Sequence, residues 1–113
     1  AGPWRLLAHA DDTKGIADTG RWNGIPPALA TYDRRVVCTY ANRDLCTLNA
    51  VYSDDQGQTW SQPVMLDMGV CHDIGYPQLF KRSDGLAVCV YYWSDTGEDA
   101  QHIKACIFNP ASL

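Results

Sequence analysis

Glutamate is nearly absent from this chain of 113 residues. Of its 13 acidic side chains only Glu98 is a glutamate, and all the others are aspartates. Helical proteins are usually rich in glutamate, because glutamate favours helices and aspartate does not. The shortage therefore argues against a helical protein. Charged residues are also few, at 19% against 46% hydrophobic residues, which excludes an intrinsically disordered chain.

Basic residues and long apolar runs are lacking as well. Nine basic side chains against 13 acidic ones give a net charge of −4, so no basic patch is available to bind a phosphate backbone, and we expect no nucleic-acid partner. No apolar run approaches the roughly 20 residues that cross a bilayer, so we expect no membrane association. The sequence starts at Ala1 without an apolar leader, and we expect a mature form or an excised piece.

The five cysteines lack the C-x-x-C spacing of zinc sites and redox motifs, and five thiols cannot all pair within one chain. Cys38, Cys89 and Cys106 lie in alternating apolar runs, where we expect buried thiols that act as small hydrophobic groups. Cys46 and Cys71 lie in expected loops and are either bridged or free. The cysteines therefore leave the cellular compartment open, and we expect neither a metal nor a cofactor.

Short runs of β-branched and aromatic residues, separated by turn residues, are typical of an all-β protein. No segment keeps a period of 3.6 residues. The runs predict strands over 4–9, 27–32, 35–41, 47–53, 59–66, 76–82, 86–93 and 102–108.

The sequence also repeats itself at an offset of 51 residues. Gly24-Ile25-Pro26 aligns with Gly75-Tyr76-Pro77, and six of the 17 positions from Gly24 to Tyr40 are identical in the second copy. The identical pairs in the strands are Val37 with Val88, Cys38 with Cys89, and Tyr40 with Tyr91. A repeat of this kind indicates a repeated structural unit.

The predicted strands divide into two antiparallel units within a single domain, 1–113. Residues 24–67 hold four strands, 73–109 hold three, and 1–23 hold a lone first strand and its loop. Four-stranded units repeated around an axis are the blades of a β-propeller. Two blades cannot close a ring, so the chain is either part of a longer protein or assembles with copies of itself. Three copies would give six blades, and we expect a homotrimer in which strand 4–9 is exchanged between neighbours.

A polar turn follows the strand 47–53. In Ser53-Asp54-Asp55-Gln56-Gly57-Gln58-Thr59-Trp60, the Asp55 carboxylate can accept hydrogen bonds from nearby N–H groups, and Gly57 can adopt a positive φ. Thr59 is expected to start the next strand, and Trp60 offers a large surface to a neighbouring sheet. We interpret the segment as a structural turn in preference to a calcium site.

These eight residues match every fixed position of the Asp box, S-x-D-x-G-x-T-W. The chain thereby resembles the sialidase (neuraminidase) superfamily of six-bladed propellers. The segment Val37-Cys38-Thr39-Tyr40-Ala41-Asn42-Arg43 is similar to the sialidase strand that ends in an active-site arginine. The segment Asp73-Ile74-Gly75-Tyr76-Pro77 looks like the one that carries the sialidase nucleophile, and is similar to the D-[IL]-G-Y-P motif of bacterial sialidase-like hydrolases.

The resemblance implies site residues at one end of the strands. Tyr76 takes the position of the nucleophile, Arg43 that of a carboxylate-binding arginine, and Asp73 that of an acid or base, with His72 as a further candidate. Strand alternation places these loops at one end and the Asp box at the other. The simpler alternatives are a packed Tyr76, a solvated Arg43 or one paired with Asp44, and turn or solvent roles for Asp73 and His72.

Two functions remain open from the sequence. The first is a sialidase-like glycoside hydrolase, or a fragment of one, acting on terminal acidic or related sugars of glycans. The alternative is a non-catalytic carbohydrate-binding or degenerate propeller module that self-assembles. The activating glutamate of sialidases would fall near Ile25 or Pro26, where none is present, and the full arginine triad is not identifiable. The resemblance suggests a secreted or periplasmic protein, and a cytoplasmic one stays open.

Overall fold

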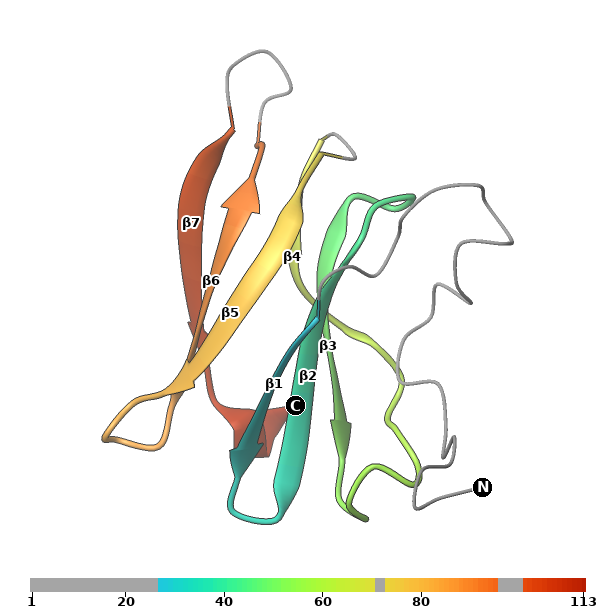
Figure 1. Ribbon diagram of the computed structural model, residues 1–113, viewed down its shortest axis with the longest axis vertical. Helices are drawn as coiled ribbons and strands as arrows, with labels where there is room; N and C mark the ends of the chain where they lie inside the picture. Colours follow the sequence, from blue (N-terminus) through green and yellow to red (C-terminus); the bar gives the residue numbers. More distant parts are fainter. Residues whose placement is uncertain (1–26, 71–72, 96–100) are drawn as a thin grey trace, which may run out of the picture.

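The computed structural model describes residues 27–70, 73–95 and 101–113, and within these ranges the regular structure is almost wholly β (Figure 1). Sheet A has four antiparallel strands in the order β1 (Ala28–Tyr32), β2 (Arg35–Asn42), β3 (Thr47–Ser53) and β4 (Val64–Met68). Sheet B has three, in the order β5 (Gly75–Lys81), β6 (Ala87–Trp93) and β7 (His102–Phe108). A short 3-10 helix, η2 (Pro110–Ser112), follows β7. The all-β prediction is confirmed, as two open antiparallel sheets.

Six of the predicted strands coincide with observed ones to within a residue at each end. The prediction of a strand over 59–66 is wrong at its start, because β4 begins only at Val64. The turn continues through Trp60, whose indole N–H donates to the Gly57 carbonyl at 3.0 Å, and Pro63 has no N–H for a ladder. Thr59 therefore belongs to the turn. The predicted strand 4–9 lies outside the described residues.

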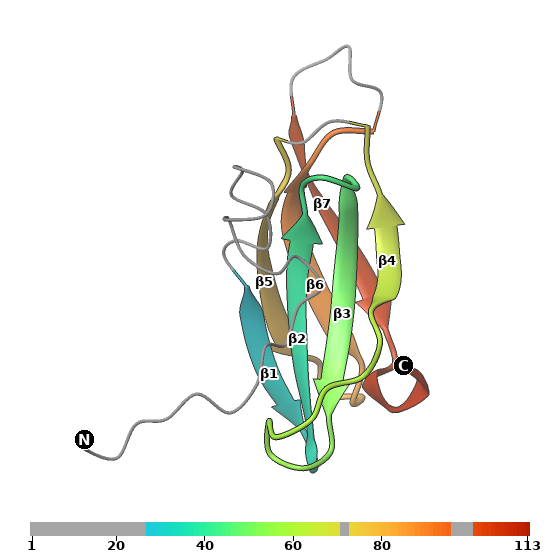
Figure 2. The same ribbon diagram turned by 90° about the vertical axis from the view of Figure 1, so that its right-hand side faces the viewer.

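The two sheets pack against each other through their broad faces (Figure 2). One part of the shared core joins Ala41 and Leu48 of sheet A to Ile74, Tyr91 and Trp93 on the side of sheet B. The rings of Tyr91 and Trp93 meet edge to face with their centroids 5.1 Å apart. A second cluster joins further residues of the two sheets: Tyr32, Val37, Ala50 and Ala87. Burial of these apolar faces provides the main driving force that holds the sheets together.

The two copies of the repeat use opposite faces for this contact. In β2, Val37 and Ala41 point to sheet B, whereas Cys38 packs with Trp60 on the other side. In β6 it is Cys89, the equivalent of Cys38, that points to sheet A, and its Sγ lies 3.8 Å from Thr39 Oγ1. We call the face of Val37 and of its equivalent Val88 the front, and the face of Cys38 and Cys89 the back. The front of sheet A thus packs on the back of sheet B.

The strands give each sheet two distinct ends. The β1–β2 turn, the β5–β6 turn and the segment after β3 lie at one end, which we call the turn end (Figure 1). The β2–β3 turn and the start of β5 lie at the other, the loop end. No helix among the described residues is long and apolar enough to cross a membrane.

Candidate functional site

Arg43 and Tyr76 meet at the loop end, although 33 positions separate them in the chain. Arg43 follows the last residue of β2, and Tyr76 is the second residue of β5. The Nε–H of Arg43 donates to the carbonyl of Ile74 at 3.0 Å, and its guanidinium carbon lies 5.6 Å from the centroid of the Tyr76 ring. This distance is within the range of a cation–π contact. The prediction that both residues lie at one end is confirmed.

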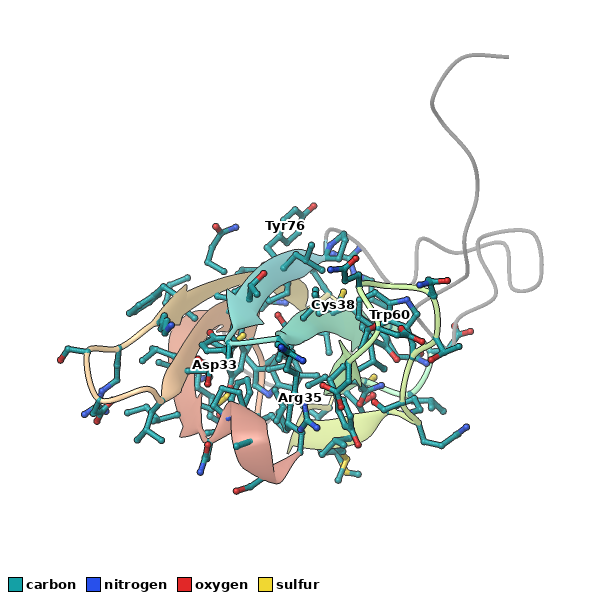
Figure 3. The ribbon with its side chains drawn as sticks, turned by 90° about the horizontal axis from the view of Figure 1, so that it is seen from below. Asp33, Arg35, Cys38, Trp60 and Tyr76 are labelled. Atoms are coloured by element: carbon teal, nitrogen blue, oxygen red, sulfur yellow. The ribbon has the colours of Figure 1, made fainter. Side chains whose placement is uncertain are left out.

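The backbone at Tyr76 is strained. Its φ is 53°, in the left-handed region that side chains other than glycine seldom adopt, and the preceding Gly75 has a φ of 131°. The pairing of β5 with β6 is irregular over the same residues, between Gly75 and Gln78. Such a bulge turns a side chain away from the regular pleat. The Tyr76 ring consequently stands off the edge of the sheet (Figure 3), and 54% of the residue is exposed.

Asp73 lies at the same end and is bonded to sheet B. Its Oδ2 accepts from the Tyr92 hydroxyl at 3.3 Å and from the Gln101 side-chain amide at 3.2 Å. The Gln101 amide also reaches the Asp73 backbone carbonyl at 3.5 Å. These contacts tie the segment before β5 to β6 and to the start of β7. His72, the remaining predicted site residue, lies outside the described residues.

Residues 53–60, the segment that matches the Asp-box pattern, form a hydrogen-bonded turn at the opposite end. Asp55 Oδ1 accepts from the Thr59 N–H at 2.8 Å and from the Ser53 hydroxyl at 2.7 Å, while its Oδ2 accepts from the Thr59 hydroxyl. Ser53 Oγ accepts in turn from the N–H of Gly57 at 2.8 Å. The Thr59 hydroxyl and N–H, aided by Ser53, lower the pKa of Asp55 to about 2.

Backbone conformation and packing also fix this turn. The Gly57 φ is 90°, as the turn requires, and Trp60 packs against Cys38, Tyr40 and Val51 on the back of sheet A. The described residues contain no group of three or more His, Cys, Asp or Glu side chains that could hold a metal ion.

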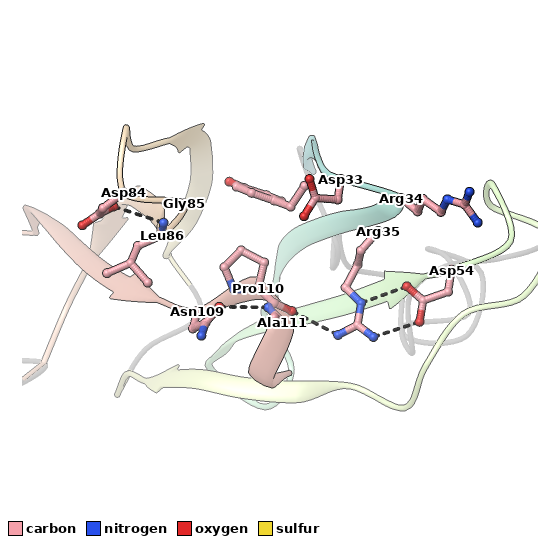
Figure 4. A pocket seen from close by; sticks show the side chains of 11 residues that line it. Asp33, Arg34, Arg35, Asp54, Asp84, Gly85, Leu86, Asn109, Pro110 and Ala111 are labelled. Atoms are coloured by element: carbon pink, nitrogen blue, oxygen red, sulfur yellow. Dashed lines mark hydrogen bonds and ion pairs between the residues drawn. The ribbon is translucent and has the colours of Figure 1, made fainter.

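A cleft of about 470 Å³ also opens at the turn end, between the two sheets (Figure 4). Its lining includes Asp33, Arg34, Asp84 and Asn109. Arg35, which also lines the cleft, is already engaged: its Nε and Nη2 donate to the two Asp54 carboxylate oxygens at 2.9 and 2.8 Å.

Arg35 links β2 to Asp54, after β3, and to Pro110 of η2, and we call this group the Arg35 clasp. Its Nη1 donates to the Pro110 carbonyl at 3.1 Å, and its guanidinium carbon lies 3.9 Å from the centroid of the Tyr52 ring. Arg35 lowers the pKa of Asp54 through their hydrogen bonds. Sequence reasoning missed this group. The register of the β2–β3 hairpin is what would have predicted this contact. Val36 pairs with Ser53, so Arg35 and Asp54, which flank that pair, lie side by side.

A second polar network missed from the sequence joins β4 to sheet B. The Tyr91 hydroxyl donates to Asp67 Oδ2 at 2.7 Å, and the Lys104 ammonium lies 3.0 Å from the same oxygen. Lys104 also lies 2.9 Å from Asp95, whose other carboxylate oxygen is 3.1 Å from His102 Nε2. Burial and the bond to Asp67 raise the pKa of Tyr91. Every member is paired within the network, so we assign it a role in holding the sheets together.

Comparisons with protein-family models, with curated proteins and with solved structures gave no match to this chain. The geometry of the two ends is therefore the basis for a functional conclusion.

Proposed function

We propose that the loop end binds a terminal acidic sugar of a glycan, with Arg43 contacting the sugar carboxylate and Tyr76 its ring. The observation that carries this proposal is the pairing of Arg43 with an exposed Tyr76 at the loop end. The Nε–H of Arg43 donates to the Ile74 carbonyl, and this bond holds the guanidinium at the loop end. A guanidinium suits a carboxylate through paired hydrogen bonds, and an aromatic face suits the apolar face of a sugar.

The internal repeat of the sequence also supports a functional role for Arg43 and Tyr76. Arg43 aligns with Ser94 and Tyr76 with Ile25 in the internal repeat. Residues that differ between two copies of one unit are not required by the architecture that the copies share. The strain at Tyr76 agrees with this view, since backbone strain is often retained where it serves a site.

A direct binding measurement tests the proposal. N-acetylneuraminic acid should perturb the NMR signals of residues beside Arg43 and Tyr76, and galactose, which lacks the carboxylate, should not. Arg43→Ala should abolish the effect. Arg34→Ala, which removes an exposed arginine at the turn end, is the matched control and should retain it. Equal binding by Arg43→Ala and the unchanged protein would refute the proposal, as would loss of binding in Arg34→Ala alone.

The second candidate function is hydrolysis of such a glycan in the manner of a sialidase-like glycoside hydrolase. The exposed, strained Tyr76 favours it as a nucleophile that, being neutral, is not repelled by the substrate carboxylate. Asp73 is the acid or base in this scheme, although its carboxylate is bonded to Tyr92 and Gln101. Release of the fluorophore from a fluorogenic sialoside, and its loss in Tyr76→Phe, would separate hydrolysis from binding. Binding without release in the unchanged protein would favour the non-catalytic alternative.

A further inference from the structure

Two cysteines of sheet B lie directly opposite each other on neighbouring strands. Cys89 of β6 pairs with Cys106 of β7, and both are free thiols in this structure. Opposite residues of antiparallel strands have their Cα atoms about 4.5–5.5 Å apart and point to the same face. A disulfide joins residues whose Cα atoms are about 4.4–6.8 Å apart. The backbone therefore already places these two thiols within the span of a disulfide.

The internal repeat shows that the second thiol is not required by the fold. Cys38 is the equivalent of Cys89 in sheet A, but it pairs with Val51 of β3. The position opposite the repeated cysteine thus takes a valine in one sheet and Cys106 in the other. Because an apolar side chain suffices there for packing, the pair of thiols in sheet B calls for a chemical explanation.

The surroundings of the two thiols differ. Cys89 is 0% exposed, whereas Cys106 is half buried on β7, an outer strand of sheet B among the described residues. A hydrogen bond from Cys89 and the nearby ammonium of Lys104 lower the pKa of Cys106. Lys104 lies two residues before Cys106, on the same face, and Asp67 holds its ammonium at 3.0 Å.

We propose that Cys106 and Cys89 form a thiol–disulfide exchange site that reacts with a low-molecular-weight disulfide, RSSR. The Cys106 thiolate attacks one sulfur of RSSR, forming a mixed disulfide and releasing RS⁻. Cys89 then attacks the Cys106 sulfur, its proton passes to the leaving sulfur, and RSH departs. The two protein thiols are thereby oxidised to one disulfide, and RSSR is reduced to RS⁻ and RSH. The proposal is independent of any sugar binding at the loop end.

The contacts of Cys89 fix the order of the two steps. An accessible thiolate beside a second thiol is the usual arrangement of a redox-active cysteine. In the reduced pair, the bond to Cys106 and burial raise the pKa of Cys89. The mixed disulfide removes the Cys106 thiolate, and with it the larger of these two causes. Cys89 consequently becomes a better nucleophile only after Cys106 has reacted.

Glutathione disulfide is a suitable probe, and tryptic mapping after the remaining thiols are blocked with N-ethylmaleimide locates the new bond. Trypsin cleaves after Arg82 and Lys104, so the expected disulfide joins peptides 83–104 and 105–113, each of which holds a single cysteine. The folded protein should form this link in preference to any other, and dithiothreitol should reverse it. Links through Cys38 or Cys46 instead, or an unreacted Cys106, would overturn the proposal.

Variants of the two cysteines separate their roles. Cys89→Ala should hold Cys106 as a lasting mixed disulfide with glutathione, because no second thiol displaces the glutathione. Cys106→Ala should leave Cys89 reduced, since Cys89 is buried. Cys46→Ser, which removes another half-buried thiol, is the matched control and should form the link like the unchanged protein.

Circular dichroism establishes that these variants are folded. A mixed disulfide at Cys106 that persists in the unchanged protein would overturn the role of Cys89, as would modification of Cys89 in the folded Cys106→Ala variant.

Discussion

Val37 and Val88 hold equivalent positions of the internal repeat, but sheet B buries Val37 completely whereas Val88 remains partly exposed on the front of sheet B. The same residue type, in the same strand of the same unit, is therefore in a core in one copy and on a surface in the other. The difference comes from what lies next to each sheet, and not from the sequence of the strand.

This pair of valines offers a matched test of the packing. Val37→Ala should lower the free energy of unfolding by about 1–3 kcal/mol, because it removes buried methyl groups and leaves a cavity. Val88→Ala in the monomer should lower it by less than Val37→Ala does, because Val88 is only partly buried. Urea unfolding of both variants at low protein concentration provides the comparison. Equal losses would show that the front of sheet B is covered in the monomer.

Asp55 should make the stability of the protein depend on pH in the acid range. Its pKa falls from an ordinary 3.8 to about 2 in the folded state, so the folded state favours the ionised form. The resulting stability is present above the unfolded pKa and is lost as the pH falls through the folded one. Asp55→Asn should therefore flatten the decline of the urea midpoint between those two pH values. Asp84→Asn, in the other turn, is a suitable control, and an unchanged slope in Asp55→Asn would contradict the turn as described.

The positive φ of Gly57 predicts a second effect at the same turn. Gly57→Val should destabilise the protein by about 1–3 kcal/mol, since a β-branched residue is strained at a φ of 90°. Crowding plays little part, because the nearest atom to an added Cβ is a Trp60 ring carbon at 3.8 Å. Gln58→Val, one residue away, loses only an exposed hydrogen bond of its side-chain amide to the Asp55 carbonyl and should cost less than Gly57→Val. Thermal melting of both variants decides the matter, and an unaffected Gly57→Val would rule out the strained backbone.

Cys89 and Cys106 of sheet B should differ in reactivity, although they lie opposite each other on the neighbouring strands β6 and β7. A hydrogen bond from Cys89 lowers the pKa of Cys106, which is only half buried. The pKa of Cys89 is raised by its bond to Cys106 and by burial, and its side chain is inaccessible. Iodoacetamide should therefore modify Cys106 before Cys89 and before the buried Cys38.

Peptide mass spectrometry over a time course measures the order, and the denatured protein, in which all thiols react alike, is the control. Modification of Cys89 at the same rate as Cys106 would contradict the assigned burial.

The strands were predictable because each is short, apolar in alternation and bounded by turn residues. The placement of Arg43 and Tyr76 followed from the alternation of strand direction, which needs no side-chain detail. The start of β4 was not predictable in this way. Thr59 and Trp60 have the composition of a strand, but the hydrogen bonds of Asp55 and of the Trp60 indole hold them in the turn.

The polar groups that bridge separate strands were the least accessible to sequence reasoning. The contact of Arg35 with Asp54 depends on the register of a hairpin, and its contact with Pro110 depends on how the end of β7 returns to sheet A. Asp67 and Lys104 meet only because two sheets pack. Spacing along the chain carries no information on contacts of this kind.

The strain at Tyr76 has a consequence for protein engineering. The φ of 53° fixes the direction of the ring through the backbone, and Pro77, buried next to it, anchors that backbone from the other side. The Asp box and the Arg35 clasp, which secure the turns, lie at the far end of the strands. Side chains at positions 43, 73 and 76 could therefore be replaced to change the surface of the loop end, while the turns that maintain the scaffold keep their native sequence.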